Sequence, residues 1–89
     1  MRSLRRPKQF KKDYKRESKS HADLDEILRS AIEKLLQGES MPPKMVDHAL
    51  HGNWKGYREC HLKPDLLLIY MLADTELTLV RLGSHSELF

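Results

Sequence analysis

The sequence predicts one α+β domain in which two N-terminal helices pack on a small twisted antiparallel sheet formed by the C-terminal half. Between residues 24 and 36 the apolar residues recur at helical spacing, whereas from residue 57 onward they alternate or run continuously, as in strands. A chain of 89 residues is long enough for one hydrophobic core and too short for two, so the expected domain spans residues 1–89.

The composition is that of a folded soluble protein, and a cytoplasmic location is expected. Hydrophobic residues make up 39% and charged residues 33% of the chain, which is typical of a soluble domain. The longest apolar run, from Leu66 to Ala73, is far shorter than the roughly 18 residues that a membrane-spanning helix needs. The single cysteine cannot form an internal disulfide and suits a reducing compartment. We therefore expect no membrane contact.

The N-terminal segment carries half of the lysines and arginines of the chain. Eight of the first sixteen residues are lysine or arginine, against one acid, Asp13, although the net charge of the whole chain is only +3. Such a segment attracts polyanions, because neutralising phosphates releases counterions. A solvated helix face, whose lysine stems cover the core, explains the same pattern. Charge alone leaves both interpretations open.

The first expected elements are a short strand and a helix with a narrow apolar face. Only Leu4 argues for an edge strand at residues 2–5. A helix over residues 7–19 begins at a proline, which is tolerated in the first turn because its missing N–H would have no partner there. Phe10 and Tyr14 share one face of this helix at a spacing of four residues.

The second helix has the clearest pattern. Asp23 and Glu26 have the spacing of a capping box, and Gly38 ends the run. Apolar residues occupy every position of one helical face, which predicts a buried face packed on the sheet. These residues are Leu24, Ile27, Leu28, Ala31, Ile32, Leu35 and Leu36. Beyond them, residues 41–44 contain two prolines and break the helical pattern.

Three strands are expected to follow as an antiparallel meander, over residues 57–62, 65–72 and 76–82. The middle strand is apolar at nearly every position, as in a strand covered on both faces. In the first strand, alternation places Glu59 and His61 on one face and Cys60 on the other. A short polar tail, residues 84–89, is expected to end the chain.

This topology brings imidazoles, carboxylates and cations to one end of the sheet. The combination suits metal-free phosphodiester cleavage: one group takes the proton of a ribose 2′-OH, another protonates the leaving 5′-oxygen, and cations offset the charge on phosphorus. Histidine suits both proton roles, because its unperturbed pKa is about 6.5. The candidates are His48, Glu59, His61, Asp65 and His85, with Lys55, Arg58, Lys63 and Arg81 nearby.

Other roles for the same residues remain open. Taken singly, each histidine also suits a hydrogen-bonded structural position. The usual zinc ligand types are all present, at His48, His51, Cys60, His61, Asp65 and His85. Their spacing argues against zinc, because it contains no two matching ligand pairs and because Cys60 and His61 face opposite ways. We interpret Cys60 and Trp54 as core residues, although a tryptophan also suits stacking on an RNA base.

Two motifs resemble those of a known family. Residues 47–89 contain H-x-L-x-G-x-W-K-G-Y-R-[DE]-x-H-x-x-P-D, from His48 to Asp65, and end in G-[ST]-H-x-x-L-F. Together they resemble the YafQ branch of the RelE superfamily, toxins of bacterial toxin–antitoxin modules. The first half of the chain is similar in layout but hardly in residues. The resemblance implies a RelE-like fold and an endoribonuclease that cuts mRNA in the ribosomal A site, without a metal or cofactor.

The resemblance also implies which residues form the site. The family's functional positions fall on His48, Glu59, His61, Asp65, His85 and Phe89. We expect His48 to be the general base and His85 the general acid, as a hypothesis. His61 and Asp65 then orient the site, and Arg81 lies close to the phosphate. RNA contacts are expected at Arg81, Lys55, Arg58, Lys63, Phe89, Lys11, Lys12 and Lys15.

The expected partners are a cognate acidic antitoxin, the ribosome through its ribosomal RNA, and mRNA, and the toxin alone is expected to be a monomer. Two other functions stay open. ParE toxins have the same fold and inhibit DNA gyrase, and a non-catalytic RNA-binding or ribosome-associated protein would use the basic helix and Trp54. Neither would need the histidines and acids, so replacing His85 separates both from a nuclease.

Overall fold

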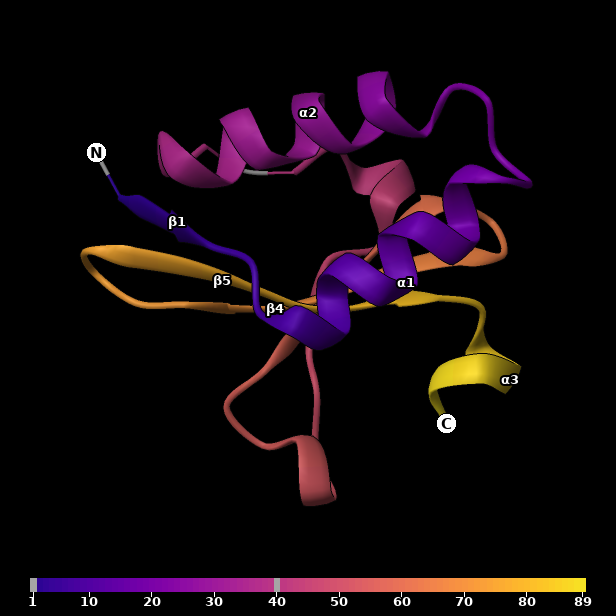
Figure 1. Ribbon diagram of the computed structural model, residues 1–89. Coiled ribbons are helices and arrows are strands. Elements are labelled where there is room, and N and C mark those ends of the chain that lie inside the picture. The colour runs from indigo at the N-terminus through magenta and orange to yellow at the C-terminus, as the bar shows by residue number, and fades with distance from the viewer. Residues whose placement is uncertain (1, 40) are drawn as a thin grey trace.

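The structure, a computed structural model, describes residues 2–39 and 41–89 and consists of one sheet with helices on both sides (Figure 1). The strands are β1 (Ser3–Arg5), β2 (His48–Ala49), β3 (Arg58–Lys63), β4 (Leu66–Leu72) and β5 (Glu76–Gly83), in the spatial order β1-β5-β4-β3-β2. The helices are α1 (Lys8–Ser18), α2 (Leu24–Leu36) and α3 (His85–Leu88), with 3₁₀ turns η1 (Pro43–Met45) and η2 (Gly52–Trp54). None of the helices described is long and apolar enough to cross a membrane.

The predicted meander is confirmed, but the sheet is mixed. β3, β4 and β5 pair antiparallel in sequence order, and β2 pairs antiparallel with β3. β1 runs parallel to β5, with Leu4 beside Leu77, so the prediction of a fully antiparallel sheet was wrong at this edge. A strand of three residues with one inward side chain specifies burial but not strand direction.

Both predicted N-terminal helices are confirmed, and their apolar faces form the main core against one face of the sheet. α1 contributes Phe10 and α2 contributes its stripe of leucines. A smaller cluster on the opposite face is built from Leu67, Ile69 and Leu88. β4 therefore has buried side chains on both faces, as its continuous apolar run predicts.

The predicted capping box at the start of α2 was wrong. Asp23 is the N-cap residue, but its side chain makes no cap hydrogen bond and accepts from Lys63 Nζ at 2.8 Å instead. A capping box occurs at Ser84, whose Oγ accepts from the N–H of Glu87 at 3.3 Å, while Glu87 Oε1 accepts from the N–H of Ser84 at 2.9 Å. It starts α3, where the sequence predicted only a polar tail.

Candidate active site

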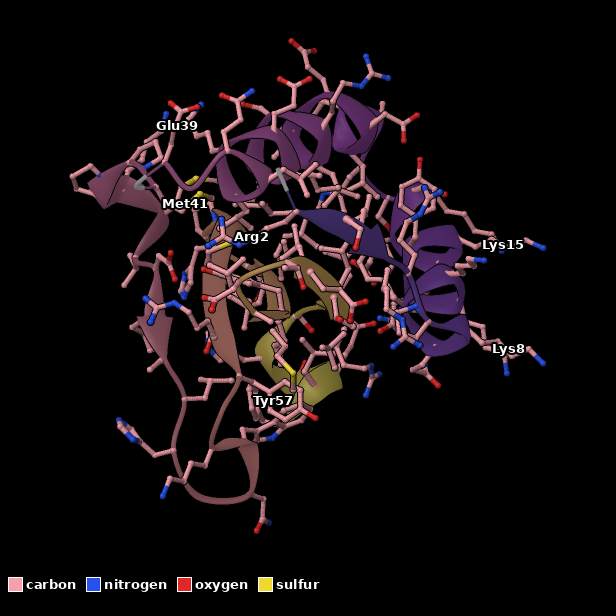
Figure 2. All side chains as sticks on the ribbon, turned by 90° about the vertical axis from the view of Figure 1, so that its left-hand side faces the viewer. Arg2, Lys8, Lys15, Glu39, Met41 and Tyr57 are labelled. Atoms are coloured by element: carbon pink, nitrogen blue, oxygen red, sulfur yellow. The ribbon has the colours of Figure 1, made fainter. Side chains whose placement is uncertain are left out.

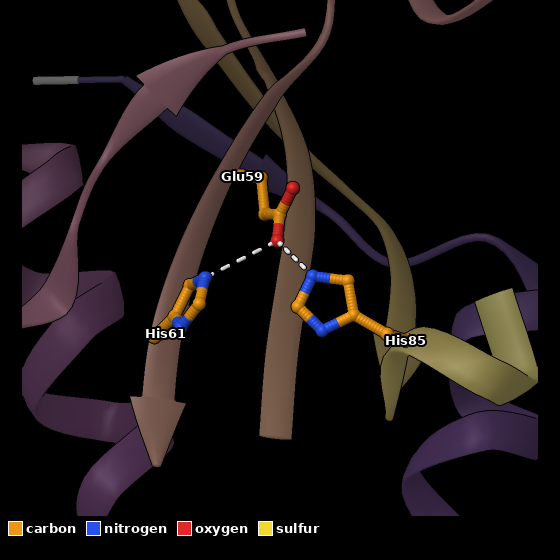
Figure 3. Close-up of side chains that lie close together, drawn as sticks. All are labelled: Glu59, His61 and His85. Atoms are coloured by element: carbon orange, nitrogen blue, oxygen red, sulfur yellow. Dashed lines mark ion pairs between the residues drawn. The ribbon is translucent and has the colours of Figure 1, made fainter. Parts of the chain in front are cut away.

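One buried carboxylate lies at the centre of a group of histidines. Glu59 on β3 has a side chain only 4% exposed, and its oxygens face three imidazole Nε2 atoms. Oε1 lies 3.3 Å from His61 and 3.5 Å from His85, which approach it from either side (Figure 3). Oε2 lies 3.5 Å from His48. We call these four residues the histidine cluster. They are four of the five predicted catalytic residues; the fifth, Asp65, is not part of the cluster.

Strand register explains this convergence. His48 lies opposite Glu59 in the β2–β3 pair, and His61 follows two positions along the same face of β3, because side chains alternate. Leu67 of β4 pairs with His61 on one side and with Gly83 of β5 on the other, so α3 begins near His61. The imidazole of His85, the first residue of α3, contacts that of His61 edge to face, with ring centroids 5.7 Å apart.

The backbone fixes the protonation site of His48. Its Nδ1 lies 2.7 Å from the carbonyl oxygen of Val46, which can only accept, so Nδ1 carries a proton. Nε2, which faces Glu59, then carries the lone pair of the neutral imidazole. Val46 has a φ of 48°, in the left-handed region that a β-branched residue rarely adopts. The sequence carried no signal for this contribution of Val46.

Glu59 Oε1 is buried without a hydrogen-bond partner within the described chain. Leaving a buried acceptor unsatisfied costs about 1–3 kcal/mol, so such atoms are rare in stable folds. The two imidazoles beside it are close enough for ion pairing but do not form hydrogen bonds in this arrangement. Oε1 is therefore placed to accept from an imidazolium N–H or from a group of a bound substrate.

Aromatic rings form one wall beside the histidine cluster. Phe89 is 56% exposed and lies over His85, with ring centroids 6.0 Å apart. Trp54 contacts Phe89 and Tyr57 edge to face, at centroid distances of 5.7 and 5.6 Å. Trp54 is half-buried and packs against the smaller core cluster, which agrees with a core role for one side of its ring system. Phe89 is thus held in place while its ring stays open to solvent.

Three members of the cluster also form a set that could hold a metal ion. One ligand atom each from Glu59, His61 and His85 lie within 4.8 Å of one another. Sequence spacing missed this set because β3 and α3 meet only in the folded chain. Cys60 is fully buried on the opposite face, and burial raises the pKa of its thiol to about 12. Cys60 is therefore confirmed as a core residue.

Among the described residues, neither Asp65 nor Lys63 forms an ion pair or hydrogen bond with the histidine cluster. Asp65 is exposed in the turn between β3 and β4, and in the part of the chain that is described no ion pair joins it to a histidine. It lines a surface pocket of about 490 Å³ with His21 and Glu87. Lys63 Nζ binds Asp23 at 2.8 Å and lies 3.1 Å from Nδ1 of His21. The predicted position of Asp65 beside His61 and its catalytic role stay predictions.

The other cations are not gathered into one cleft either. Arg58 binds Asp47 through Nε and Nη2, both at 3.2 Å. Arg81 donates from Nε to Asp13 at 2.7 Å. Lys55 is exposed after η2. The sequence could not reveal these carboxylate partners, because each lies on a different element. Contacts of these cations with RNA stay predictions.

The outer face of α1 is basic and open to solvent. Its predicted RNA-contact residues are all exposed, and Figure 2 shows Lys15 pointing away from the sheet. These residues are Lys11, Lys12 and Lys15. The inner face of the same helix buries Asp13 and Glu17 beside Phe10. The two carboxylates were not predicted to be buried.

Comparison with known proteins agrees with the resemblance in the sequence. A family model described as "Bacterial toxin of type II toxin-antitoxin system, YafQ" matches residues 2–89. The chain is 41% identical over 83 residues to the mRNA interferase toxin YafQ of Escherichia coli K12. The aligned region covers 91% of this chain and 88% of that protein.

Solved structures share the fold over nearly the whole chain. A copper-bound mutant toxin from Helicobacter pylori has a TM-score of 0.94 and 47% identity, covering 100% of both chains. A chain of the E. coli DinJ–YafQ complex has a TM-score of 0.89 and 38% identity, covering 100% of this chain and 99% of that one. The chain belongs to the YafQ family of bacterial toxins from type II toxin–antitoxin systems.

Proposed function

We propose that this chain is the toxin of a type II toxin–antitoxin module and inhibits translation by cleaving mRNA. The observation that carries the proposal is the convergence of three imidazole Nε2 atoms on the buried carboxylate of Glu59. The E. coli relative, at 41% identity, is named an mRNA interferase. We further propose that cleavage occurs in the cytoplasm, in the A site of a translating ribosome.

Cleavage requires a base at the 2′-oxygen and an acid at the 5′-oxygen. In the proposed step, Nε2 of His48 takes the proton of the 2′-OH while the 2′-oxygen attacks phosphorus. The bond from phosphorus to the 5′-oxygen breaks, and Nε2 of His85 donates a proton to that oxygen. The products are a 2′,3′-cyclic phosphate and a 5′-hydroxyl, and a proton passes from His48 to His85 through water before the next cycle.

Glu59 and His61 orient the two proton carriers. Oε2 of Glu59 faces Nε2 of His48, so the carboxylate stabilises the imidazolium that forms when His48 accepts a proton. Oε1 lies between His61 and His85 and so favours rings that point Nε2 inward. A carboxylate in this position also keeps the positive charge of the cluster low before RNA binds.

Arg81 and Asp65 keep their expected roles as part of the proposal. Arg81 lies in the same row of the sheet as Glu59, with Ile69 of β4 between them. Its guanidinium can therefore offset charge on a phosphate bound over that row. Asp65, at the exposed turn that follows β3, is proposed to orient RNA at the margin of the site.

The same cluster fits a metal ion, and metal binding would compete with proton transfer. Glu59, His61 and His85 supply the carboxylate and imidazole ligands that zinc and copper accept, and a bound ion would act as a Lewis acid. An ion on Nε2 of His85 removes the proton that this nitrogen donates. We therefore propose cleavage without a metal or cofactor. The toxin is treated with EDTA and freed of the chelator before it is added to programmed ribosomes in Mg²⁺ buffer. Equal rates for treated and untreated toxin support this proposal, whereas loss of activity that added zinc or copper restores contradicts it.

The proposed partner is an acidic antitoxin, and translation continues while it is bound to the toxin. E. coli YafQ forms a complex with DinJ. A net charge of +3, with the exposed lysines of α1, favours association with an acidic partner. The same lysines are proposed to contact ribosomal RNA when the antitoxin is absent, and the free toxin is proposed to be monomeric.

The test is primer extension on an mRNA translated with the wild-type protein, with His85→Ala and with His51→Ala. His51 is an exposed histidine outside the cluster, so its replacement is a matched control. We expect discrete cuts within codons for the wild type and His51→Ala, and a rate about 10²- to 10⁴-fold lower for His85→Ala. Equal cutting by His85→Ala would show that this histidine is not the acid. No cutting by folded wild type would favour a gyrase inhibitor or a non-catalytic ribosome-binding protein.

A further inference from the structure

We propose that Asp13 and Arg16 of α1 are positioning residues for the nuclease site, because they hold α3, which carries His85, against β5. The inference rests on the proposed function, since it requires that His85 takes part in cleavage. It assigns a role to the inner face of α1, whose outer face is basic. The contacts run from the buried carboxylate of Asp13 to Arg16, and from Arg16 to Glu87 of α3.

Asp13 is the fixed point of this arrangement. Its side chain is 0% exposed and accepts from Arg81 Nε at 2.7 Å, from the N–H of Leu82 at 3.1 Å and from Gln9 Nε2 at 3.1 Å. Burial alone raises the pKa of this carboxyl, but the bonds from Arg81, Leu82 and Gln9 outweigh it and lower the pKa below its ordinary value. Asp13 is therefore an ionised and fully bonded anchor, and it also directs Arg81.

Asp13 and Arg16 together complete the edge of β5. β1 pairs with β5 only as far as Thr78, so the peptide groups farther along this edge have no neighbouring strand. At Leu82 the N–H donates to Asp13, and the carbonyl oxygen accepts from Arg16 Nη2 at 2.9 Å. Two side chains of α1 thus provide, at Leu82, the hydrogen bonds that a neighbouring strand would otherwise make.

Arg16 connects this edge to α3. Its Nη1 lies 3.1 Å from Asp13, and its Nε lies 2.8 Å from Glu17 and 3.1 Å from Oε2 of Glu87. The other oxygen of Glu87 is used by the capping box with Ser84. A helix of four residues is not stable by itself, so its direction depends on such outside contacts and on Leu88 in the smaller core cluster.

Gly83, the last residue of β5, leaves room for the close approach of Arg16. A Cβ built on Gly83 would lie 2.8 Å from Arg16 Nη2 and 3.2 Å from Oε1 of Glu87. A larger residue at this position would require the end of the Arg16 side chain to shift, and the carboxylate of Glu87 to move by a few tenths of an ångström. His85, two residues further on, takes its direction from this junction.

Replacing either end of the ion pair between Arg16 and Glu87 separates positioning from a simple charge effect. Arg16→Met removes a cation, whereas Glu87→Gln removes an anion and keeps the capping box, because glutamine also caps at this position. If Arg16 only attracted RNA, KM would rise in Arg16→Met and fall in Glu87→Gln. Positioning instead predicts that kcat falls in both, by about tenfold to a hundredfold, with KM little changed.

The measurement is the rate of mRNA cleavage on purified programmed ribosomes, together with the thermal midpoint of each variant. Arg5→Met and Glu76→Gln are matched controls, because Arg5 and Glu76 form an exposed ion pair at 3.8 Å away from α3. We expect wild-type rates for both controls. In a His85→Ala background, Arg16→Met and Glu87→Gln are expected to cause no further loss.

Each outcome decides between two claims. If His85→Ala is inactive but folded Arg16→Met and Glu87→Gln keep the wild-type kcat, the positioning role is wrong and the proposed function stands. Opposite shifts of KM with unchanged kcat also overturn it in favour of a charge effect. If wild type cleaves no mRNA, or His85→Ala cleaves normally, the proposed function itself fails. Should Arg16→Met not fold, Glu87→Gln alone still decides.

Discussion

Two buried carboxylates, Asp13 and Glu59, differ in whether their oxygens are satisfied. Asp13 accepts hydrogen bonds from two arginines, a glutamine and a backbone N–H. Glu59 is equally withdrawn from water, yet its Oε1 has no hydrogen-bond partner and faces two imidazoles. A satisfied buried carboxylate stabilises a fold, whereas an unsatisfied one beside titratable groups costs stability and is kept for chemistry.

The largest expected effect is on the chemistry around Glu59. His48→Ala and His85→Ala should each lower the cleavage rate about 10²- to 10⁴-fold. Single-turnover cleavage on programmed ribosomes measures both rates, and urea unfolding checks that both variants are folded. A normal rate for either folded variant would show that its histidine carries no proton in the reaction.

Asp13→Asn should affect stability most. Removing the charge leaves Arg81 and Arg16 without their buried partner, and breaking such a pair typically costs about 3 kcal/mol. Urea unfolding of the variant and of the wild type measures the difference. A loss below about 0.5 kcal/mol, the range of exposed pairs, would show that Asp13 is not an anchor.

The same anchor should make the fold sensitive to acid. The pKa of Asp13 is lowered in the folded state, so its contribution to stability is complete above the ordinary aspartate pKa of about 3.9 and is lost as the pH falls through the lowered folded pKa. The difference in unfolding free energy between wild type and Asp13→Asn should stay constant from pH 7 to about 5 and shrink below about 4. A constant difference down to pH 2 would argue against an ionised Asp13.

The smallest effect is expected at Val46. Its left-handed backbone strains a β-branched residue, whereas asparagine tolerates this conformation. Val46→Asn should keep the carbonyl that holds His48 and raise the unfolding free energy by up to about 1 kcal/mol. Thermal unfolding measures this change, and a clear loss of stability would show that the Val46 side chain contributes packing that outweighs the strain.

Local patterns predicted much of the fold and part of the site. The apolar stripe of α2 and the alternation of β3 placed the helix and the opposite faces of Glu59 and Cys60 correctly, because both depend on neighbours along the chain. The burial of Asp13 could not be predicted from its neighbours along the chain. Its ion-pair partner Arg81 is 68 residues away, and a lone acid among lysines has the pattern of a surface residue.

The same limit applies to the ends of the chain. The direction of β1 depends on β5, and α3 forms because Glu87 both caps the helix and binds Arg16. Asp65 belongs to a turn, whose residues leave the alternation of the strands, so its position relative to His61 did not follow from register. Long-range contacts decided the direction of β1 and the pairing of Glu87 with Arg16, whereas the capping box and the turn at Asp65 are local features.

The unsatisfied carboxylate of Glu59 is expected to serve catalysis and not stability. Wild type and Glu59→Gln are compared for mRNA cleavage on programmed ribosomes and for urea unfolding. We expect Glu59→Gln to have a cleavage rate at least about 10²-fold lower, with an unfolding free energy equal to or above that of the wild type. A normal cleavage rate with a clear loss of stability would show instead that Glu59 is a structural residue.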